Sequence, residues 1–69
     1  MKISARNSFA GSISKIVRGS VSTEVTIRVS PSMEIVSVIT TNSAKRLKLK
    51  KGQSAHALIK ADSVLIGVD

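Results

Sequence analysis

The chain has 69 residues, no cysteine and a formal net charge of +7, with 11 Lys and Arg residues against 4 Asp and Glu residues. This length predicts a single domain over residues 1–69, and the lack of cysteine excludes disulfides and thiolate metal sites. The excess of cations predicts an anionic ligand or partner: a small oxyanion, a nucleic acid or an acidic membrane. Because so small a core is marginal alone, we expect a homo-oligomer.

The first half of the chain predicts three strands. Residues 11–18 run into the turn signal Gly19-Ser20, and residues 21–29 alternate between a mostly apolar and a polar set of side chains. Alternation with period two is typical of a half-buried strand, so the two segments predict a hairpin. After the turn signal Ser30-Pro31-Ser32, residues 33–40 are apolar on both faces beyond Glu34, which predicts a central or intersubunit strand.

The second half predicts a short helix followed by two strands. Residues 40–43 offer N-cap side chains for a helix that contains Ala44 and Leu47 and ends before Lys51-Gly52. Residues 53–60 predict a fourth strand and residues 64–68 a fifth. Three strands, a short helix and two further strands follow the order of an OB-type barrel. We therefore predict an all-β, OB-fold-like five-stranded barrel with one short helix between strands three and four.

The termini predict a free-standing cytoplasmic protein. Met1-Lys2-Ile3 is not followed by an apolar run of signal-peptide length, because Ser and Gly interrupt residues 4–14. No stretch approaches the roughly 20 apolar residues of a membrane span, so no membrane partner is expected. Because the chain starts with Met1 and ends soon after the fifth predicted strand, we expect a complete protein, not a fragment of a transporter or transcription factor.

Three polar stretches are candidates for binding an anion. Ser4 and Arg6 lie two residues apart, so in an extended chain both donors project to the same side. Residues 40–43 lie at a strand-to-helix junction, where the first helical N–H groups lack intrahelical partners. Lys60 and the backbone of Ala61 follow the fourth predicted strand. Each stretch alone has a simpler explanation: a solvated terminus, a helix cap, or an exposed lysine beside a turn.

Taken together, three motifs resemble those of the molbindin family of small molybdate-binding proteins, whose TOBE-type domain is also called the molybdenum-pterin-binding domain. The motifs are Ser-Ala-Arg-Asn at residues 4–7, Ile-Thr-x-x-Ser at residues 39–43 and Ile-Lys-Ala-Asp-Ser-Val at residues 59–64. The resemblance extends over essentially the whole chain. It implies an OB-like barrel, a hexamer built as a trimer of dimers, and oxoanions bound between subunits.

The resemblance also implies which residues bind. One subunit is expected to provide Ser4 and Arg6, with the backbone of Ala5 nearby. Another subunit is expected to provide Thr40, Ser43, Lys60 and the backbone of Ala61. A second site near the threefold axis is implied as well, and the turn Arg18, Gly19 and Ser20 is its candidate. The chain departs from the family in having Ala61 where some relatives have serine, and in the strongly basic run from Lys45 to Lys51.

The donor chemistry agrees with molybdate or tungstate as the ligand. Molybdate is an unprotonated dianion at neutral pH, and Ser, Thr, Lys, Arg and backbone N–H groups are donors that need no acceptor beside them. Hydrogen phosphate carries a proton that such a site leaves unpaired, at a cost of roughly 1–3 kcal/mol. Sulfate must be rejected by size, whereas tungstate is nearly the same size as molybdate. The predicted role is storage and buffering of the oxoanion, with no cofactor.

Two other classes of function fit less well. A basic OB-fold that binds nucleic acid is favoured by the charge and the Lys45 to Lys51 run, but such folds usually stack bases on aromatic side chains. Phe9 is the chain's one aromatic residue. An enzyme is not expected, because the single histidine, His56, has no nucleophile motif or metal-ligand companions around it. Gene control is not expected either, because no DNA-reading helix is predicted.

Overall fold

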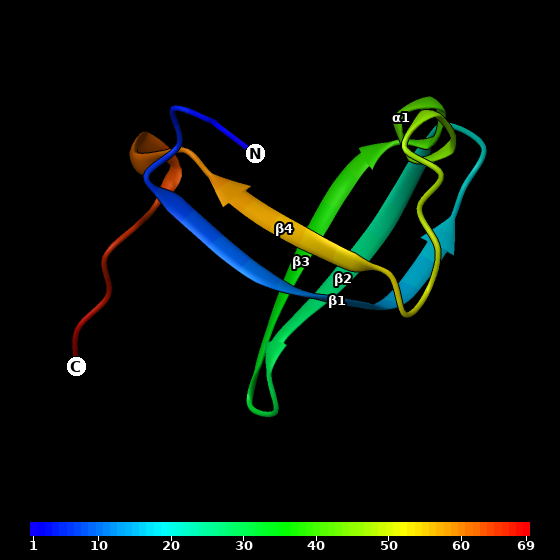
Figure 1. The fold of residues 1–69 in the computed structure, drawn as a ribbon. Helices are drawn as coiled ribbons and strands as arrows, with labels where there is room; N and C mark the ends of the chain where they lie inside the picture. Colours follow the sequence, from blue (N-terminus) through cyan, green and yellow to red (C-terminus); the bar gives the residue numbers. More distant parts are fainter.

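The computed structural model describes residues 1–69, which form a curled, open four-stranded antiparallel sheet and one short helix (Figure 1). The elements are β1 (Asn7–Arg18), β2 (Ser22–Ser30), β3 (Met33–Thr40), α1 (Thr41–Arg46), β4 (Ser54–Ile59) and the 3-10 turn η1 (Ala61–Ser63). In the sheet the strand order is β3-β2-β1-β4. Neither helical element is long and apolar enough to cross a membrane.

The long strand β1 joins the two halves of the sheet. From Asn7 to Ser12 it pairs with β4, and from Ser12 to Arg18 it pairs with β2. The register shifts between Ile13 and Lys15, and such a bulge bends a strand and increases its twist. At Gly11 a Cβ atom would lie 2.3 Å from the carbonyl oxygen of Arg28, so only glycine allows β2 to approach this closely.

The hydrophobic core lies on the concave side of the sheet and is small. Ile13, Val25, Ile27 and Ala57 form its buried centre. Partly buried side chains surround them: Phe9, Ile16, Val29, Ile35, Ile39, Leu49 and Ala55. Only 8 of 69 residues are buried in the single chain, so much of the apolar surface that could stabilise it remains exposed to water.

The helix α1 begins where the sequence predicts it. The Thr40 side chain caps it, with Oγ1 accepting a hydrogen bond from the Ser43 N–H at 3.1 Å. The next residue, Thr41, is buried and its Oγ1 donates to the carbonyl of Gly19 at 2.7 Å. Because a hydroxyl has one hydrogen, the 2.8 Å contact between the two Oγ1 atoms of Thr23 and Thr41 must be donated by Thr23. This network holds α1 against the turn between β1 and β2.

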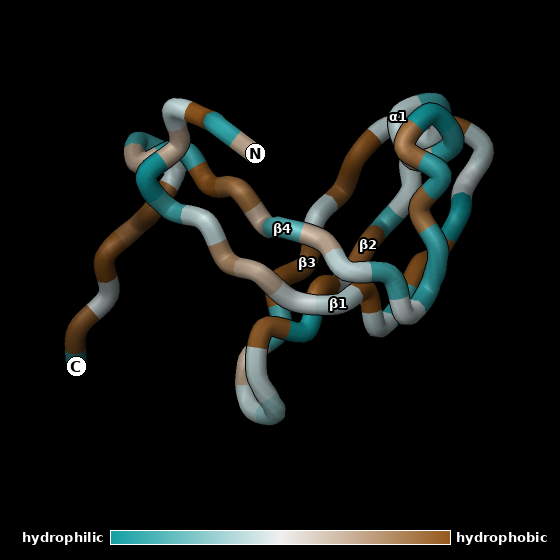
Figure 2. Tube along the Cα trace, viewed as in Figure 1, coloured by the Kyte–Doolittle hydropathy of each residue, from teal (hydrophilic) through white to brown (hydrophobic).

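The predicted fifth strand is wrong for the single chain. Residues 64–69 have no regular secondary structure and run away from the sheet as a mostly hydrophobic tail (Figures 1 and 2). The side chains of Leu65 and Val68 are 92% and 91% exposed. A strand forms only where another strand offers its N–H and C=O groups, and here none lies alongside the tail. The all-β, OB-type architecture is confirmed as an open half-barrel with four strands.

The predicted central position of residues 33–40 is also wrong within the single chain. The strand β3 pairs only with β2 and therefore forms an edge of the sheet. Val36 and Val38 lie 57% and 69% exposed on its outer face. The chain itself has no element that could bury the outer apolar face of this edge strand. That β3 lies at an interface between subunits, the other position expected from the sequence, stays a prediction. The first strand begins earlier than predicted, at Asn7, because β4 provides a partner for residues 7–12.

Candidate anion-binding site

An open cavity of about 410 Å³ brings together two of the three polar stretches. It is lined by Ser4, Ala5, Arg6, Lys60, Ala61 and Asp62. Because β1 and β4 are antiparallel, the start of β1 lies opposite the end of β4, with Asn7 facing Ile59. The Asn7 Nδ2 atom also donates to the Ile59 carbonyl at 3.3 Å. Strand pairing therefore places residues 4–6 beside residues 60–62, although more than 50 residues separate them.

The cavity offers a hydroxyl, a guanidinium and an ammonium group, with one carboxylate among them. Lys60 Nζ lies 3.9 Å from Asp62 Oδ2, and these side chains are 81% and 75% exposed. An ion pair this exposed contributes only about 0–1 kcal/mol, so Lys60 can exchange Asp62 for another anion at little cost. The Ser4 and Arg6 side chains are exposed as well. In the single chain the cavity is thus an open, mostly cationic surface.

The helix α1, which Thr40 caps and which contains Ser43, lies at the opposite end of the curved sheet from the start of β1 and the end of β4 (Figure 1). Strand register explains the separation: Thr40 pairs with Ser22, which adjoins the Arg18 end of β1, whereas the cavity adjoins the Asn7 end. Eleven residue steps of strand correspond to roughly 35 Å along its path. Thr40 Oγ1 also donates to Ser43 Oγ at 2.8 Å, so here these hydroxyls serve as the helix cap.

The seven candidate residues thus divide into two groups. We call Ser4, Ala5, Arg6, Lys60 and Ala61 the terminal half-site, and Thr40 and Ser43 the helical half-site. The resemblance implied that Lys60 and Ala61 come from the subunit that provides Thr40 and Ser43. Within one chain, the structure places Lys60 and Ala61 beside Ser4 and Arg6, because β1 and β4 pair directly.

The second candidate site, Arg18, Gly19 and Ser20, forms the turn beside α1. The Gly19 N–H donates to the Ser22 carbonyl at 2.9 Å, and Arg18 Nη2 donates to the Leu49 carbonyl at 2.8 Å. The backbone donor of Gly19 is therefore occupied within the turn, while Arg18 keeps further N–H groups. Hydrogen bonding from Thr41 to Gly19 places this turn at the same end of the molecule as the helical half-site.

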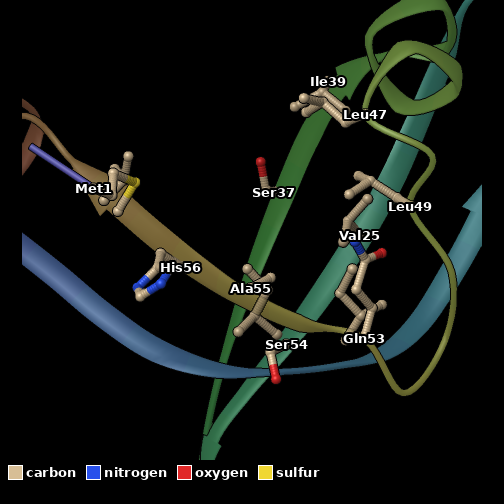
Figure 3. Close-up of a pocket in the computed structure, with 13 residues that line it drawn as sticks. Met1, Val25, Ser37, Ile39, Leu47, Leu49, Gln53, Ser54, Ala55 and His56 are labelled. Carbon is tan, nitrogen blue, oxygen red and sulfur yellow. The ribbon is translucent and has the colours of Figure 1, made fainter. Parts of the chain in front are cut away.

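A second cavity, which the sequence did not indicate, opens on the concave face of the sheet (Figure 3). It measures about 390 Å³, and 9 of its 13 lining residues are hydrophobic, including Ile39, Leu47 and Leu49. A closed five-stranded barrel would cover this face. His56 is among the lining residues, but no group of three or more His, Cys, Asp or Glu residues could hold a metal ion. The cavity is mostly apolar, and no Lys or Arg lines it.

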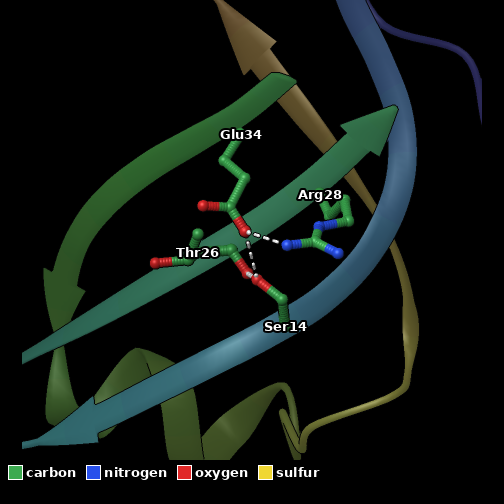
Figure 4. Close-up of polar contacts among 4 residues, drawn as sticks. All are labelled: Ser14, Thr26, Arg28 and Glu34. Carbon is green, nitrogen blue, oxygen red and sulfur yellow. Dashed lines mark hydrogen bonds and ion pairs between the residues drawn. The ribbon is translucent and has the colours of Figure 1, made fainter. Parts of the chain in front are cut away.

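The remaining paired charges belong to a surface cluster on the other side of the sheet (Figure 4). Arg28 Nη2 and Ser14 Oγ both donate to Glu34 Oε2, at 3.3 and 3.2 Å. Ser14 is the bulged residue of β1, and its hydroxyl also lies 3.4 Å from the Thr26 carbonyl. In this cluster the negative charge of Glu34 offsets the positive charge of Arg28. The cluster lies outside both half-sites.

Comparisons with known proteins identify close relatives. The TOBE domain family model matches residues 3–66. The chain is 51% identical over 69 residues to the molybdenum transport protein ModE of Herbaspirillum seropedicae, of which it covers 26%. It is 41% identical to a probable molybdenum-pterin-binding protein of Haemophilus influenzae, with both chains covered completely. The solved structure of the cytoplasmic molybdate-binding protein ModG, with molybdate bound, matches with a TM-score of 0.93 at 40% identity, over all of this chain and 49% of that one.

The relatives differ in how much of their own length this chain represents. It spans about a quarter of the two ModE relatives, at 26% and 24%. It spans the entire Haemophilus protein. The matching part is therefore a unit that occurs both alone and within longer proteins.

Proposed function

This chain belongs to the TOBE domain family, and on that premise we propose that it binds molybdate or tungstate reversibly, as a store and buffer, without catalysing a reaction. The observation that carries the proposal is the terminal half-site. Residues 4–6 and 60–61 come from opposite ends of the sequence and line one cavity with hydroxyl, guanidinium and ammonium donors. The relatives named for molybdate or molybdenum-pterin support the choice of ligand.

The donor types favour a fully deprotonated oxoanion. Arg6 can hold two oxygens of one tetrahedral anion through its forked N–H groups, while Lys60 contributes a compact charge and Ser4 a hydroxyl. Because such an oxoanion has no hydrogen of its own, these three groups bind it by donating hydrogen bonds alone. Hydrogen phosphate must also pair its own hydrogen, and among the charged groups that line the cavity only the Asp62 carboxylate is an acceptor. We propose no cofactor for this protein.

We propose that the complete site forms between subunits of a homo-oligomer. The terminal half-site is too exposed to enclose an anion, and the helical half-site of the same chain lies too far away to close it. A second copy can bring its Thr40 and Ser43 to the terminal half-site of the first. Desolvation by the second copy would then strengthen each charge-assisted hydrogen bond to the ligand.

The exposed apolar surfaces support this assembly. Leu65, Ile66 and Val68 in the tail are about nine-tenths exposed, and β3 leaves Val36 and Val38 uncovered. Burying one such side chain contributes roughly 1.5–3 kcal/mol. The tail, paired with another copy, can complete the fifth strand that its own chain does not form. A hexamer, arranged as a trimer of dimers, is the form we propose.

Storage in the cytoplasm is the role that we propose for the assembly. The description of ModG as a cytoplasmic molybdate-binding protein supports this location. Neither a membrane nor a nucleic acid is needed as a partner.

Titration calorimetry tests the proposed function directly. Molybdate and tungstate should each bind far more tightly than sulfate or phosphate at equal ionic strength, and light scattering should give about six times the 7.3 kDa chain mass. Equal heats for all four anions would reduce the site to a nonspecific basic surface. A monomer at micromolar concentration with ligand present would exclude the intersubunit site.

A further inference from the structure

One charged surface has no part in either half-site. Between residues 45 and 51, five of the chain's 11 Lys and Arg residues are found, and all five side chains are exposed. We call this surface the basic segment: Lys45, Arg46, Lys48, Lys50 and Lys51. None of these five residues belongs to an ion pair, because the two pairs of the structure join Arg28 to Glu34 and Lys60 to Asp62. It is therefore an uncompensated patch of five positive charges.

The backbone holds the basic segment in a defined conformation. Leu49 N–H donates to the Ala44 carbonyl at 3.1 Å, Gly52 N–H donates to Ile13 at 2.8 Å, and Lys50 N–H donates to Gln53 Oε1 at 3.0 Å. Lys48 has φ 53°, a left-handed conformation that non-glycine residues rarely adopt. Between the cations, Leu47 and Leu49 line the apolar cavity (Figure 3). The cations are thus carried by a hydrogen-bonded loop and do not belong to a flexible tail.

The basic segment lies next to the helical half-site. Lys45 and Arg46 form the last turn of α1, whose cap is Thr40, and a helix of six residues rises only about 9 Å. Lys45 and Arg46 therefore lie within about 10 Å of Thr40 and Ser43, and the Leu49–Ala44 and Lys48–Lys45 hydrogen bonds keep Lys48 and Lys50 beside the same helix. Charges at this range act on a dianion through the field, because the Debye length is about 10 Å at 0.1 M salt and about 30 Å at 0.01 M.

We propose that the basic segment is an electrostatic capture surface that accelerates binding of dianionic oxoanions without touching the bound ligand. The inference rests on the proposed function, since it concerns the rate at which that same site fills. One cation about 12 Å from a dianion in water at 0.01 M salt raises the local anion concentration about twofold. Two such cations should raise it about fourfold, and at 1 M salt the effect should vanish. A long-range field of this kind changes kon, whereas direct contacts determine koff.

Two double variants with the same net charge distinguish the effect of the basic segment on kon from the effect of the protein's total charge. Lys45→Gln with Lys50→Gln removes two charges from the basic segment. Lys15→Gln with Ser32→Glu changes the net charge equally, at exposed positions on β1 and in the β2–β3 turn. Calorimetry with molybdate gives Kd at 0.01 M and 1 M salt. To measure koff, the complex is mixed with an excess of a catechol dye that changes colour when it captures released molybdate. The rate constant kon is then koff divided by Kd.

The expected kon of the Lys45/Lys50 variant at 0.01 M salt is about fourfold below that of the control variant, with koff within twofold and no difference at 1 M. Equal kon values in the two variants would overturn the capture role while leaving the proposed function intact. A wild-type protein that binds no molybdate would overturn both. A loss of single-stranded DNA retention on filters with kon unchanged would assign the basic segment to nucleic acid and also overturn the capture role.

Discussion

Replacing Thr41 by valine should destabilise the protein by orphaning a buried hydroxyl. Thr41 Oγ1 donates to the Gly19 carbonyl and accepts from Thr23 Oγ1. Gly19 is exposed, so water can replace its lost donor at little cost. Thr23 is 0% exposed, and its hydroxyl would keep a hydrogen with no acceptor. Leaving a buried donor unpaired costs about 1–3 kcal/mol, and we expect the Thr41→Val variant to lose about that much stability.

A double-mutant cycle makes this prediction specific to the hydroxyl pair. In Thr23→Val, Thr41 keeps its bond to Gly19, so the loss should be smaller, about 0.5–1.5 kcal/mol. In the double variant no buried hydroxyl is left unpaired, so its loss should fall below the sum of the two single losses by about 1 kcal/mol or more. Thr41→Ser keeps the hydroxyl and serves as the matched control.

Urea unfolding followed by far-UV circular dichroism measures these differences, at one protein concentration because assembly contributes to stability. Thr41 also affects the helical half-site, because its hydrogen bond to Gly19 holds Thr40 and Ser43 against the β1–β2 turn. Thr41→Val should therefore weaken molybdate binding, and Thr41→Ser should not. Strictly additive losses, or a Thr23→Val variant less stable than Thr41→Val, would refute the assigned direction of the hydrogen bonds.

Three further predictions follow from the packing and the half-sites. Gly11→Ala places a Cβ 2.3 Å from a backbone oxygen of Arg28, so it should cost at least about 2 kcal/mol in thermal unfolding. Ser8→Ala, at an exposed position of the same strand, should cost little, and equal losses would contradict the close approach. Arg6→Ala should cost about 2–5 kcal/mol of molybdate binding by calorimetry, whereas Lys45, Lys48 and Lys50 changed together to Gln should alter affinity by less than about tenfold, mostly at low salt. The reverse order would mean that the terminal half-site is wrongly assigned. Deleting residues 65–69 should reduce the number of subunits in the assembly, measured by light scattering as total mass divided by chain mass. An unchanged number of subunits would exclude the tail from the assembly.

The local elements of this fold could be predicted from the sequence because their signals lie within a few residues of one another. Period-two alternation in residues 21–29 predicted β2, and the N-cap residues at 40–43 followed by apolar Ala44 and Leu47 predicted α1. The turn at residues 30–32 was likewise indicated by its own Ser-Pro-Ser. These patterns act through backbone geometry and side-chain direction, which depend little on the rest of the chain.

The tertiary structure decided everything that depends on which strands become neighbours. Residues 64–68 have the β-branched composition of a strand, yet no edge of their own sheet pairs with them. The motifs around Arg6 and Lys60 were visible in the sequence, but only the antiparallel pairing of β1 with β4 showed that one chain brings them together and leaves Thr40 at the far end. Strand pairing is a contact between distant residues, selected by the burial of a shared core, and no local pattern encodes it.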